Sequence, residues 1–426
     1  MATYTEIFTA YILNGARRAL EQVQQGMGRV PDEVRLQAWH LLTYALTVEE
    51  AWPSVRDLLL DLAPRMEMAG YRHEWLPFLQ TGIKYSRLRD DKPITAELSL
   101  QLGYLQLRLR DFESAETALL AAQSEFVLLD NRPRQSLCLV RLAQVARYQN
   151  ARNAALALLD DAEALIPPDA RETGYCHFVR GLLATDAHDW EEAVAHFQQS
   201  LDRWQAAGDR RQMALSFLNL GRARAYAYQY HPGPDPAPAP LLTEALAHTR
   251  NALDLFRAVN DYQHQASCYS QLGYLHAWQG DSQAALTMYT QAQSICHQTH
   301  DRLELAFVDR NLGVEYLKLG RYTEAQSAFE ESIAGFEQTG HELEALVSRE
   351  GWCEVYLAQG EYPQAIEALN RTLDRLTALM EQSPGDDDAC THLAAELRSF
   401  LAQAEEKMAS VSTQTALDGD GAASAF

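Results

Sequence analysis

One pattern constrains this chain more than any other, a repeating unit of about 40 residues in its central part. Small residues recur at intervals of 38 to 40 residues, with one interval of 52, at Gly103, Ala143, Gly181, Gly221, Gly273, Gly313 and Cys353. Each is followed by an alanine and then by a larger side chain four positions on, as in Ala325 and Phe329. A period in this range is typical of solenoids, in which stacked units share one continuous core.

Helix starts are predicted at a fixed distance before each small residue. These positions are Asp91, Asn131, Asp169, Asp209, Asp261, Asp301 and His341. Nearly all are Asp or Asn, whose side-chain oxygen accepts hydrogen bonds from the unpaired amides of a first helical turn. Joints such as Gly320-Arg-Tyr322 follow the small residue, and they end one helix and start the next. Each unit is therefore predicted to be two antiparallel helices, whose backbones approach closely at the small residues.

The clearest unit reads Asn311-Leu-Gly313-x-x-Tyr316, then Gly320-x-Tyr322-x-x-Ala325-x-x-x-Phe329. This motif resembles the tetratricopeptide repeat. The longer spacing is similar to the repeats of kinesin light chains, polarity adaptors and bacterial peptide-responsive regulators. The resemblance covers residues 91 to 380 and implies an all-α fold, a right-handed superhelical solenoid of antiparallel helix pairs. A fold of this kind does not by itself define a function.

The pattern divides the chain into four parts. Residues 1–90 are interpreted as an N-terminal helical cap with a degenerate repeat, because the apolar end of a solenoid needs covering; a separate functional domain is the alternative. Residues 91–380 hold seven repeats, interrupted by a proline-rich insertion at 231–240 that is either an inert loop or a docking peptide. A C-terminal capping helix is predicted at 381–408 and a disordered tail at 409–426.

Charge and hydropathy exclude several classes of partner. The chain has 36 Lys and Arg against 58 Asp and Glu, a formal net charge of −22, which argues against nucleic acid as a partner. We find no apolar stretch near the roughly 18 residues that a membrane helix requires, so no membrane partner is expected. The first residues lack the basic-then-apolar order of a secretory signal, and a cytoplasmic location is predicted.

No sequence pattern indicates catalysis or a cofactor. Phosphate-binding glycine loops are absent from the sequence, and the six cysteines form no Cys-x-x-Cys pair. Cys138, Cys176 and Cys268 share one position in their repeats, which favours packing over reactivity. The densest group of metal-ligand types, Cys296 to His300, places its cysteine in the apolar phase of a helix. We therefore predict no enzyme activity, no metal and no cofactor.

The resemblance implies where a partner binds, because the first helix of each pair lines the inner groove in proteins with this repeat. Counting from the small residues gives a candidate set that carries more positive than negative charge. Its members are Arg108, Arg141, Arg147, Asn219, Arg222, Tyr226, Gln271, Tyr274, Trp278, Arg310, Asn311 and Lys318.

Three amides in this set share one repeat position. Asn219, Gln271 and Asn311 each stand immediately before Leu-Gly, similar to the asparagine ladder of kinesin light chains and polarity adaptors. Amide side chains both donate and accept, so they can clamp the backbone of an extended peptide. The arginines can pair with Asp, Glu or a C-terminal carboxylate. The alternative is that a solvated solenoid face carries polar residues without any ligand.

The sequence therefore predicts a non-enzymatic adaptor or scaffold that binds a partner protein or an extended peptide, acidic or C-terminal, in its concave groove. Two alternatives stay open: a peptide-responsive regulatory sensor, and a regulatory subunit of a bacterial signalling or defence complex with catalysis on another chain. The sequence gives no oligomeric state.

Overall fold

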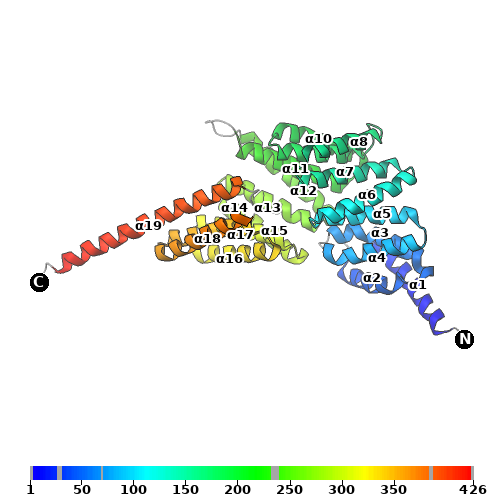
Figure 1. Cartoon of the computed structure of the whole chain (residues 1–426), viewed down its shortest axis with the longest axis horizontal. Helices are drawn as coiled ribbons and strands as arrows, with labels where there is room; N and C mark the ends of the chain where they lie inside the picture. Colours follow the sequence, from blue (N-terminus) through cyan, green and yellow to red (C-terminus); the bar gives the residue numbers. More distant parts are fainter. Residues whose placement is uncertain (1–2, 26–30, 69–70, 232–238, 383–386, 424–426) are drawn as a thin grey trace. The chain divides into compact units, whose positions relative to one another are not determined.

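The computed structural model describes residues 3–25, 31–68, 71–231, 239–382 and 387–423. All regular elements within these residues are helices, which follow one another as antiparallel pairs (Figure 1). The predicted all-α repeat solenoid is confirmed. The chain forms two compact units, residues 1–268 and residues 269–426, called here the first unit and the second unit. The division falls inside helix α13.

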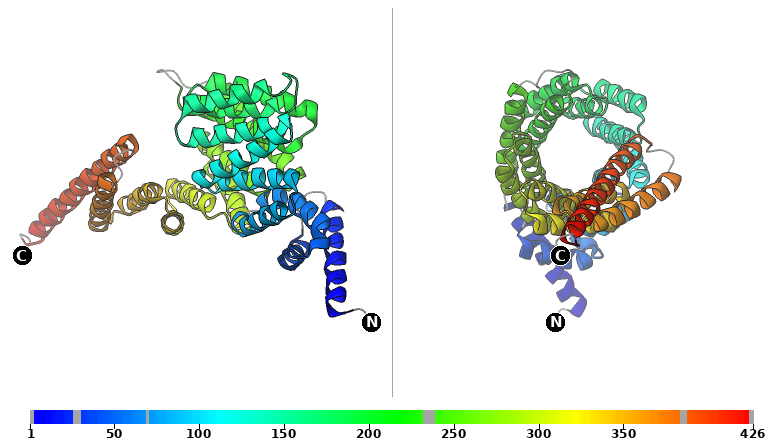
Figure 2. Two further views of the ribbon diagram at one scale, coloured as in Figure 1. Left: turned by 45° about the vertical axis from the view of Figure 1, so that its right-hand side comes forward. Right: turned by 90° about the vertical axis from the view of Figure 1, so that its left-hand side faces the viewer.

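The first unit contains four helices before the repeats and then four complete repeat pairs. The helices are α1 (Tyr4–Gln25), α2 (Asp32–Ala45), α3 (Trp52–Met68), α4 (Arg72–Leu88), α5 (Lys92–Arg108), α6 (Phe112–Leu128), α7 (Arg132–Tyr148), α8 (Arg152–Ala164), α9 (Thr173–Asp186), α10 (Trp190–Ala207), α11 (Arg210–Gln229) and α12 (Ala239–Ala258), with a 3-10 turn at Glu49–Ala51. Their pairs follow a curve (Figure 2). The core of α1 to α4 continues into Leu98 and Leu102 of α5.

The second unit begins within α13 (Tyr262–Trp278). It continues through α14 (Ser282–Thr299), α15 (Arg302–Lys318), α16 (Tyr322–Thr339), α17 (Glu342–Gln359), α18 (Tyr362–Gln382) and α19 (Asp387–Ala423). Helix α19 packs on the last pair through a buried cluster that includes Leu369, Leu393 and Leu397. The apolar side of α18 is thereby covered.

The small residues of the repeat do what their spacing predicts. A Cβ atom placed on Gly103 would lie 2.7 Å from Cγ of Leu119, and one on Gly313 would lie 2.9 Å from Cε1 of Phe329. These distances are shorter than real Cβ contacts allow, so the helices of these two pairs are held at a separation that only glycine permits. The larger side chain four residues after the alanine fills the space over the glycine.

Most joints between the repeat helices contain a residue with left-handed backbone, although the α8–α9 joint does not. Glycine supplies it at Gly280, Gly320 and Gly360, with φ between +71° and +78°. Other joints place a residue with a side chain in the same region, including Arg110 at φ 62° and His188 at φ 59°. Both kinds of residue end the first helix of a pair and turn the chain into the second.

One predicted helix start is wrong. Asn131, Asp209, Asp261 and Asp301 each accept the amide three residues on. Asp169 does not, because it follows Pro167 and Pro168 in a turn, and α9 starts only at Thr173. Asp91 precedes α5 as predicted, but its carboxylate accepts a hydrogen bond from the Trp52 indole instead of capping.

Several predicted segment boundaries stay as predictions. Most of the proline-rich insertion, residues 232–238, lies outside the described residues. Helix α19 continues to Ala423, beyond the predicted helix end at 408, and the structure does not describe side chains after Ser410. The role of residues 1–90 as a cap also stays a prediction.

Candidate functional site

In the first unit, side chains of successive first helices contact one another along a continuous inner face. Tyr104 of α5, Arg141 of α7 and Tyr175 of α9 form a stack. Arg211 of α11 reaches Glu67 of α3, although 144 residues separate them. This contact joins the end of α3 to the start of α11. Side chains of α5, α7 and α9 thus contact one another directly, and the surface that they share is called here the inner face of this unit.

Arg141 is the best-prepared cation on this inner face. Its guanidinium carbon lies 4.1 Å from the ring centre of Tyr104 and 5.4 Å from that of Tyr175. Its Nη1 donates to Oε1 of Gln144 at 2.9 Å. Within the described residues Arg141 has no carboxylate partner. Two aromatic faces thus hold a guanidinium whose charge is not neutralised.

Two other predicted cations of the first unit are already paired. Arg147 binds Asp186 of α9 through both Nε and Nη2, the latter at 2.7 Å. Burial alone would lower the pKa of Arg147, but the hydrogen bond and charge of Asp186 raise it. Arg108 lies 3.5 Å from Glu67, whose side chain is 5% exposed. These arginines hold neighbouring helices together and are less available to a partner than Arg141.

The remaining predicted residues of the first unit lie on α11. The amide nitrogen of Asn219 donates to the backbone oxygen of Leu215 at 2.8 Å, and the side chain is buried. Arg222 is half-buried and forms no ion pair within the described residues. Tyr226 is 36% exposed and packs against Trp190 and Tyr230. The side-chain amide of Asn219, which is predicted to clamp a peptide, therefore already donates one hydrogen bond to the backbone of its own helix.

In the second unit, Gln271 of α13 is buried, and neither its amide oxygen nor its amide nitrogen has a hydrogen-bond partner in the described structure. Tyr274, one turn further on, is 37% exposed. Its ring meets that of Tyr289 edge-on at 5.8 Å and lies 6.4 Å from Trp278. A buried amide group without a partner is rare in folded proteins and marks this position as unusual.

The next first helix, α15, carries the other predicted residues of the second unit. Asn311 is 8% exposed and occupies the repeat position of Gln271. Arg310 lies 5.1 Å from the ring centre of Phe307 and has no carboxylate partner in the described segments. Lys318 is paired with Glu315 at 2.6 Å. The hydroxyl of Ser270 donates to Glu304 at 2.9 Å and links α13 to α15.

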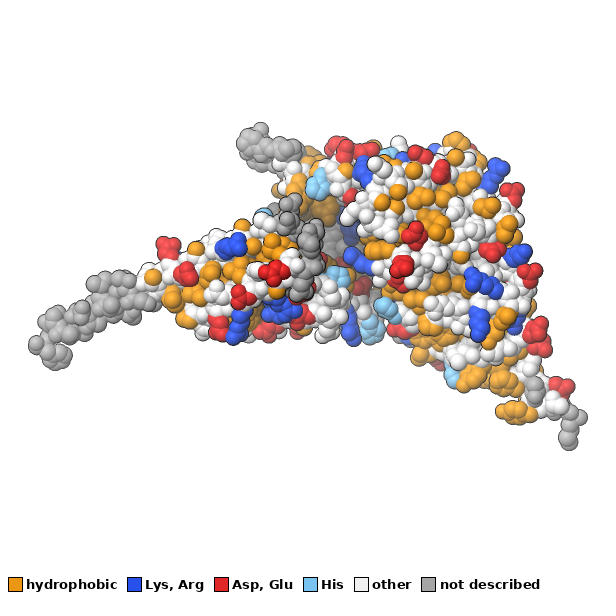
Figure 3. Space-filling view, in the orientation of Figure 1, with side chains coloured by type: hydrophobic (Ala, Val, Ile, Leu, Met, Phe, Trp, Pro, Cys, Tyr) orange, Lys and Arg blue, Asp and Glu red, His pale blue; other side chains and the backbone are white. Residues whose placement is uncertain are grey.

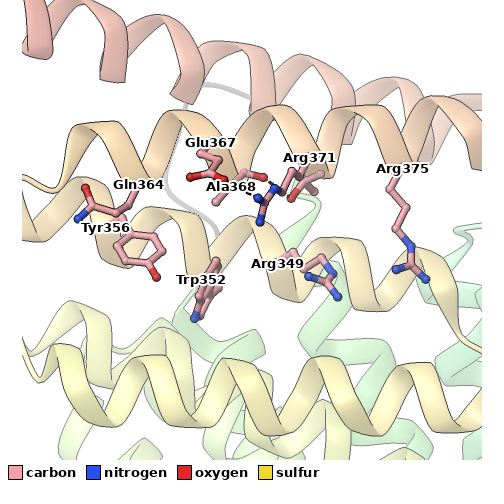
Figure 4. A pocket seen from close by; sticks show the side chains of 9 residues that line it. Arg349, Trp352, Tyr356, Gln364, Glu367, Ala368, Arg371 and Arg375 are labelled. Carbon is pink, nitrogen blue, oxygen red and sulfur yellow. Dashed lines mark hydrogen bonds and ion pairs between the residues drawn. The ribbon is translucent and has the colours of Figure 1, made fainter.

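Sequence reasoning missed a cavity of about 420 Å³ between α17 and α18. Figure 4 shows Trp352 and Tyr356 on one helix facing Gln364 and Glu367 on the next, with three guanidinium groups beside them. Arg349 is paired with Glu337, Arg371 with Glu367, and Arg375 with Glu342. The cavity is therefore balanced in charge and lined by residue types common at protein interfaces.

An equivalent cavity of about 460 Å³ lies between α4, α5 and α6 and is lined by residues such as Ser99, Leu102 and Gln106. Ser99 and Gln106 stand at the repeat positions of Arg349 and Tyr356 relative to the small residues Gly103 and Cys353. The signal that would have found both cavities is this shared position.

The face of the first unit in Figure 3 carries acidic and basic side chains interspersed, without an extended patch of one sign.

The six cysteine side chains are buried. Burial raises the pKa of the Cys138 and Cys353 thiols to about 12. Among the described residues no group of three His, Cys, Asp or Glu side chains is arranged to hold a metal ion. In the same residues no helix combines the length and apolar character needed to cross a membrane.

A family model described as tetratricopeptide repeat matches residues 265–338 and 304–378. No curated protein matches the chain. The structure of an APC/C hetero-tetramer, Cut9-Hcn1, aligns with a TM-score of 0.57 at 15% identity, over 90% of this chain and 62% of that one. A STAND protein with a tetratricopeptide repeat sensor from Pyrococcus horikoshii aligns with a TM-score of 0.57 at 14% identity, over 92% of this chain and 56% of that one.

A third similar structure is a Rap protein complexed with Competence and Sporulation Factor. It aligns with a TM-score of 0.51 at 13% identity and covers 94% of this chain and 99% of the Rap protein. This chain thus spans less than two thirds of the Cut9-Hcn1 and STAND chains but nearly all of the Rap chain. At these identities the likeness concerns the fold.

Proposed function

We propose that this tetratricopeptide-repeat protein is a non-catalytic adaptor that binds an extended segment of a partner protein along α13 and α15 of its second unit. The observation that carries the proposal is the buried amide of Gln271, whose oxygen and nitrogen both lack partners. The fold supports a role in binding a partner protein, since repeats of this kind present side chains on a continuous face. The Gln271 amide indicates where on that face the partner segment would bind.

An unsatisfied buried amide is costly to keep. Leaving a buried donor or acceptor without a partner costs roughly 1–3 kcal/mol, whereas an apolar side chain of similar shape avoids that cost. A peptide backbone offers the complementary pair, one N–H donor and one carbonyl acceptor per residue. Asn311 stands at the same repeat position on α15, so two amides lie at equivalent places on successive first helices. They would hold two points of one extended segment.

The cations favour an acidic partner segment. Arg310 is held against Phe307 without a carboxylate partner in the part of the chain described, and it lies next to Asn311 in sequence. In the first unit, Arg141 likewise lies against aromatic rings, those of Tyr104 and Tyr175, without a carboxylate partner among the described residues. An Asp or Glu side chain would form a bidentate pair with either guanidinium. Exposed neighbours such as Tyr274 would add apolar contact to such a segment.

The test is the nearly isosteric substitution Gln271→Met. It removes the unsatisfied amide, so we expect the melting temperature to rise while affinity for the best binders of an extended-peptide library falls on the order of tenfold. Gln106→Met is the matched control, because Gln106 is also buried with an unpartnered amide oxygen but lies outside the predicted binding set. It should raise stability without changing peptide affinity. Unchanged affinity in Gln271→Met would contradict the proposal.

A peptide-responsive sensor is the second candidate. The supporting observation is the likeness to the Rap protein, whose structure contains Competence and Sporulation Factor and which this chain covers almost completely. A sensor changes conformation when its peptide binds, whereas an adaptor of fixed shape does not. Small-angle scattering with and without a bound library peptide separates the two, since only the sensor changes its radius of gyration.

A further inference from the structure

The first unit contains an ionic contact that a solenoid does not require. Nη2 of Arg211 on α11 donates to Oε2 of Glu67 on α3 at 2.8 Å. Nε of the same guanidinium donates to Oδ2 of Asp261, directly before α13, at 2.8 Å. One arginine therefore joins helices from three separate places in the chain.

The separation in sequence is what makes this contact unusual. Repeats in a solenoid contact their neighbours, so their stability is a sum of nearest-neighbour terms. The Arg211–Glu67 pair spans 144 residues. A second connection runs beside it, because Oε1 of Gln263 accepts hydrogen bonds from Arg72 of α4 and Arg108 of α5. The start of α13 is thus tied to the N-terminal helices at two points.

The groups of this network are enclosed. The side chain of Asp261 is 0% exposed, that of Glu67 5% and that of Arg211 19%. Asp261 is held from its other side by Nδ1 of His264 at 2.8 Å, and the His264 ring stacks on Phe256. Breaking a buried pair by removing one member is strongly destabilising, because the remaining charge stays uncompensated. Removal of Arg211 would take one cation from two enclosed carboxylates at once and leave Glu67 with Arg108 and Asp261 with His264.

We propose that Arg211, Glu67 and Asp261 form a latch that closes the curve of the first unit, so that α3, α11 and the start of α13 open and close together. With the latch closed, the inner face that carries Arg141 has one fixed curvature. With the latch open, the same helix pairs form an ordinary open solenoid, in which each pair is constrained only by its neighbours. The latch itself does not depend on the proposed partner binding, which concerns α13 and α15 of the second unit.

Hydrogen exchange of the full chain tests the latch. In Arg211→Gln we expect exchange to accelerate on the order of 100-fold in α3 and at the start of α13, which lie far from each other in sequence. The radius of gyration from small-angle scattering should increase. Arg147→Gln is the matched control, since it breaks a bidentate pair between the neighbouring helices α7 and α9. Its effect should stay within those two helices.

Two results would overturn the latch. One is unchanged exchange in α3 of Arg211→Gln, and the other is acceleration confined to α11 and its sequence neighbours. Should Arg211→Gln fail to fold, Arg211→Lys replaces it, because lysine keeps the charge but cannot engage two carboxylates through a planar fork. It should then accelerate exchange in α3 and at the start of α13 together, by a smaller factor. Library-peptide affinity measured on the same variants reports on the proposed function separately.

Discussion

Gly181 on α9 lies directly under the ring of Phe197 on α10, so closely that a Cβ atom on the glycine would be 2.7 Å from Cε1 of the ring. The preceding pair solves the same packing problem differently, with Ala143 facing Leu159 at the equivalent positions, both fully buried. These two pairs thus have a similar combined side-chain volume, although the individual side chains differ in size.

This relationship predicts that Gly181→Ala destabilises the first unit by about 1–3 kcal/mol, because the added methyl overpacks the contact. The sign of this change in the free energy of unfolding is informative, since replacing glycine by alanine inside a helix normally stabilises the helix by about 1 kcal/mol. The double variant Gly181→Ala with Phe197→Leu reproduces the Ala143 and Leu159 arrangement and should recover part of the loss. Urea unfolding of the three proteins measures both effects, and a stabilised Gly181→Ala protein would refute this account.

The left-handed joints predict a stabilising substitution. His300 ends α14 at φ 54°, a conformation that costs a residue with a side chain roughly 1–2 kcal/mol and glycine almost nothing. His300→Gly should therefore raise the melting temperature of the second unit. His297→Gly is the control, because His297 is exposed within α14 and glycine weakens a helix interior. Differential scanning calorimetry should show opposite shifts for the two variants.

The repeat made most of the architecture predictable, because its signals are local. An Asp such as Asp209 or Asp301 caps the helix that follows it, and a small residue such as Gly313 meets the aromatic of its own pair. The helix start predicted at Asp169 is wrong for an equally local reason, the two prolines before it. Propensity and spacing act over a few residues, so they describe what happens within a pair.

The pairing of the candidate site residues was not predictable from spacing. Arg108 and Arg147 stand at inner-face positions of their repeats, yet their partners Glu67 and Asp186 come from other helices. The Arg211 contacts depend on the curvature accumulated over several repeats, which no single repeat encodes. The partner-binding role of the twelve candidate residues stays a prediction.

Cysteine accessibility gives a test of the packed core. All six cysteines are buried and none of them is in a disulfide in the described structure, and burial raises the pKa of Cys176 to about 12, so the reactive thiolate is scarce at neutral pH. We expect iodoacetamide to modify none of the six in the folded protein within a time that labels a free thiol completely. Full modification should appear in denaturant, as measured by intact mass. Rapid labelling of any one cysteine under native conditions would show that its helix pair opens.

Acid and base should affect the two units in opposite directions. In the first unit, burial raises the pKa of Glu67, but Arg211, Arg108 and Arg72 outweigh this and leave it below its usual value. Burial also lowers the pKa of His264, more than Asp261 raises it. Both groups bind protons more readily when unfolded, so this unit loses stability as pH falls below the ordinary histidine pKa of about 6.5 and further below the glutamate value of about 4.3.

In the second unit, burial raises the pKa of Asp309 to about 7, although the amide of Gln293 opposes it. Burial, together with Glu396 and Glu354, also raises the pKa of Glu350 to about 7. These carboxyls bind protons more readily when folded, so this unit loses stability as pH rises from about 4 through 7. Hydrogen exchange corrected for intrinsic rates, at about pH 5.5 and about pH 7.5, should show α11 better protected at the higher pH and α15 at the lower. Asp309→Asn should weaken the response of α15 without altering that of α11, and parallel changes in the two units would contradict the assignment.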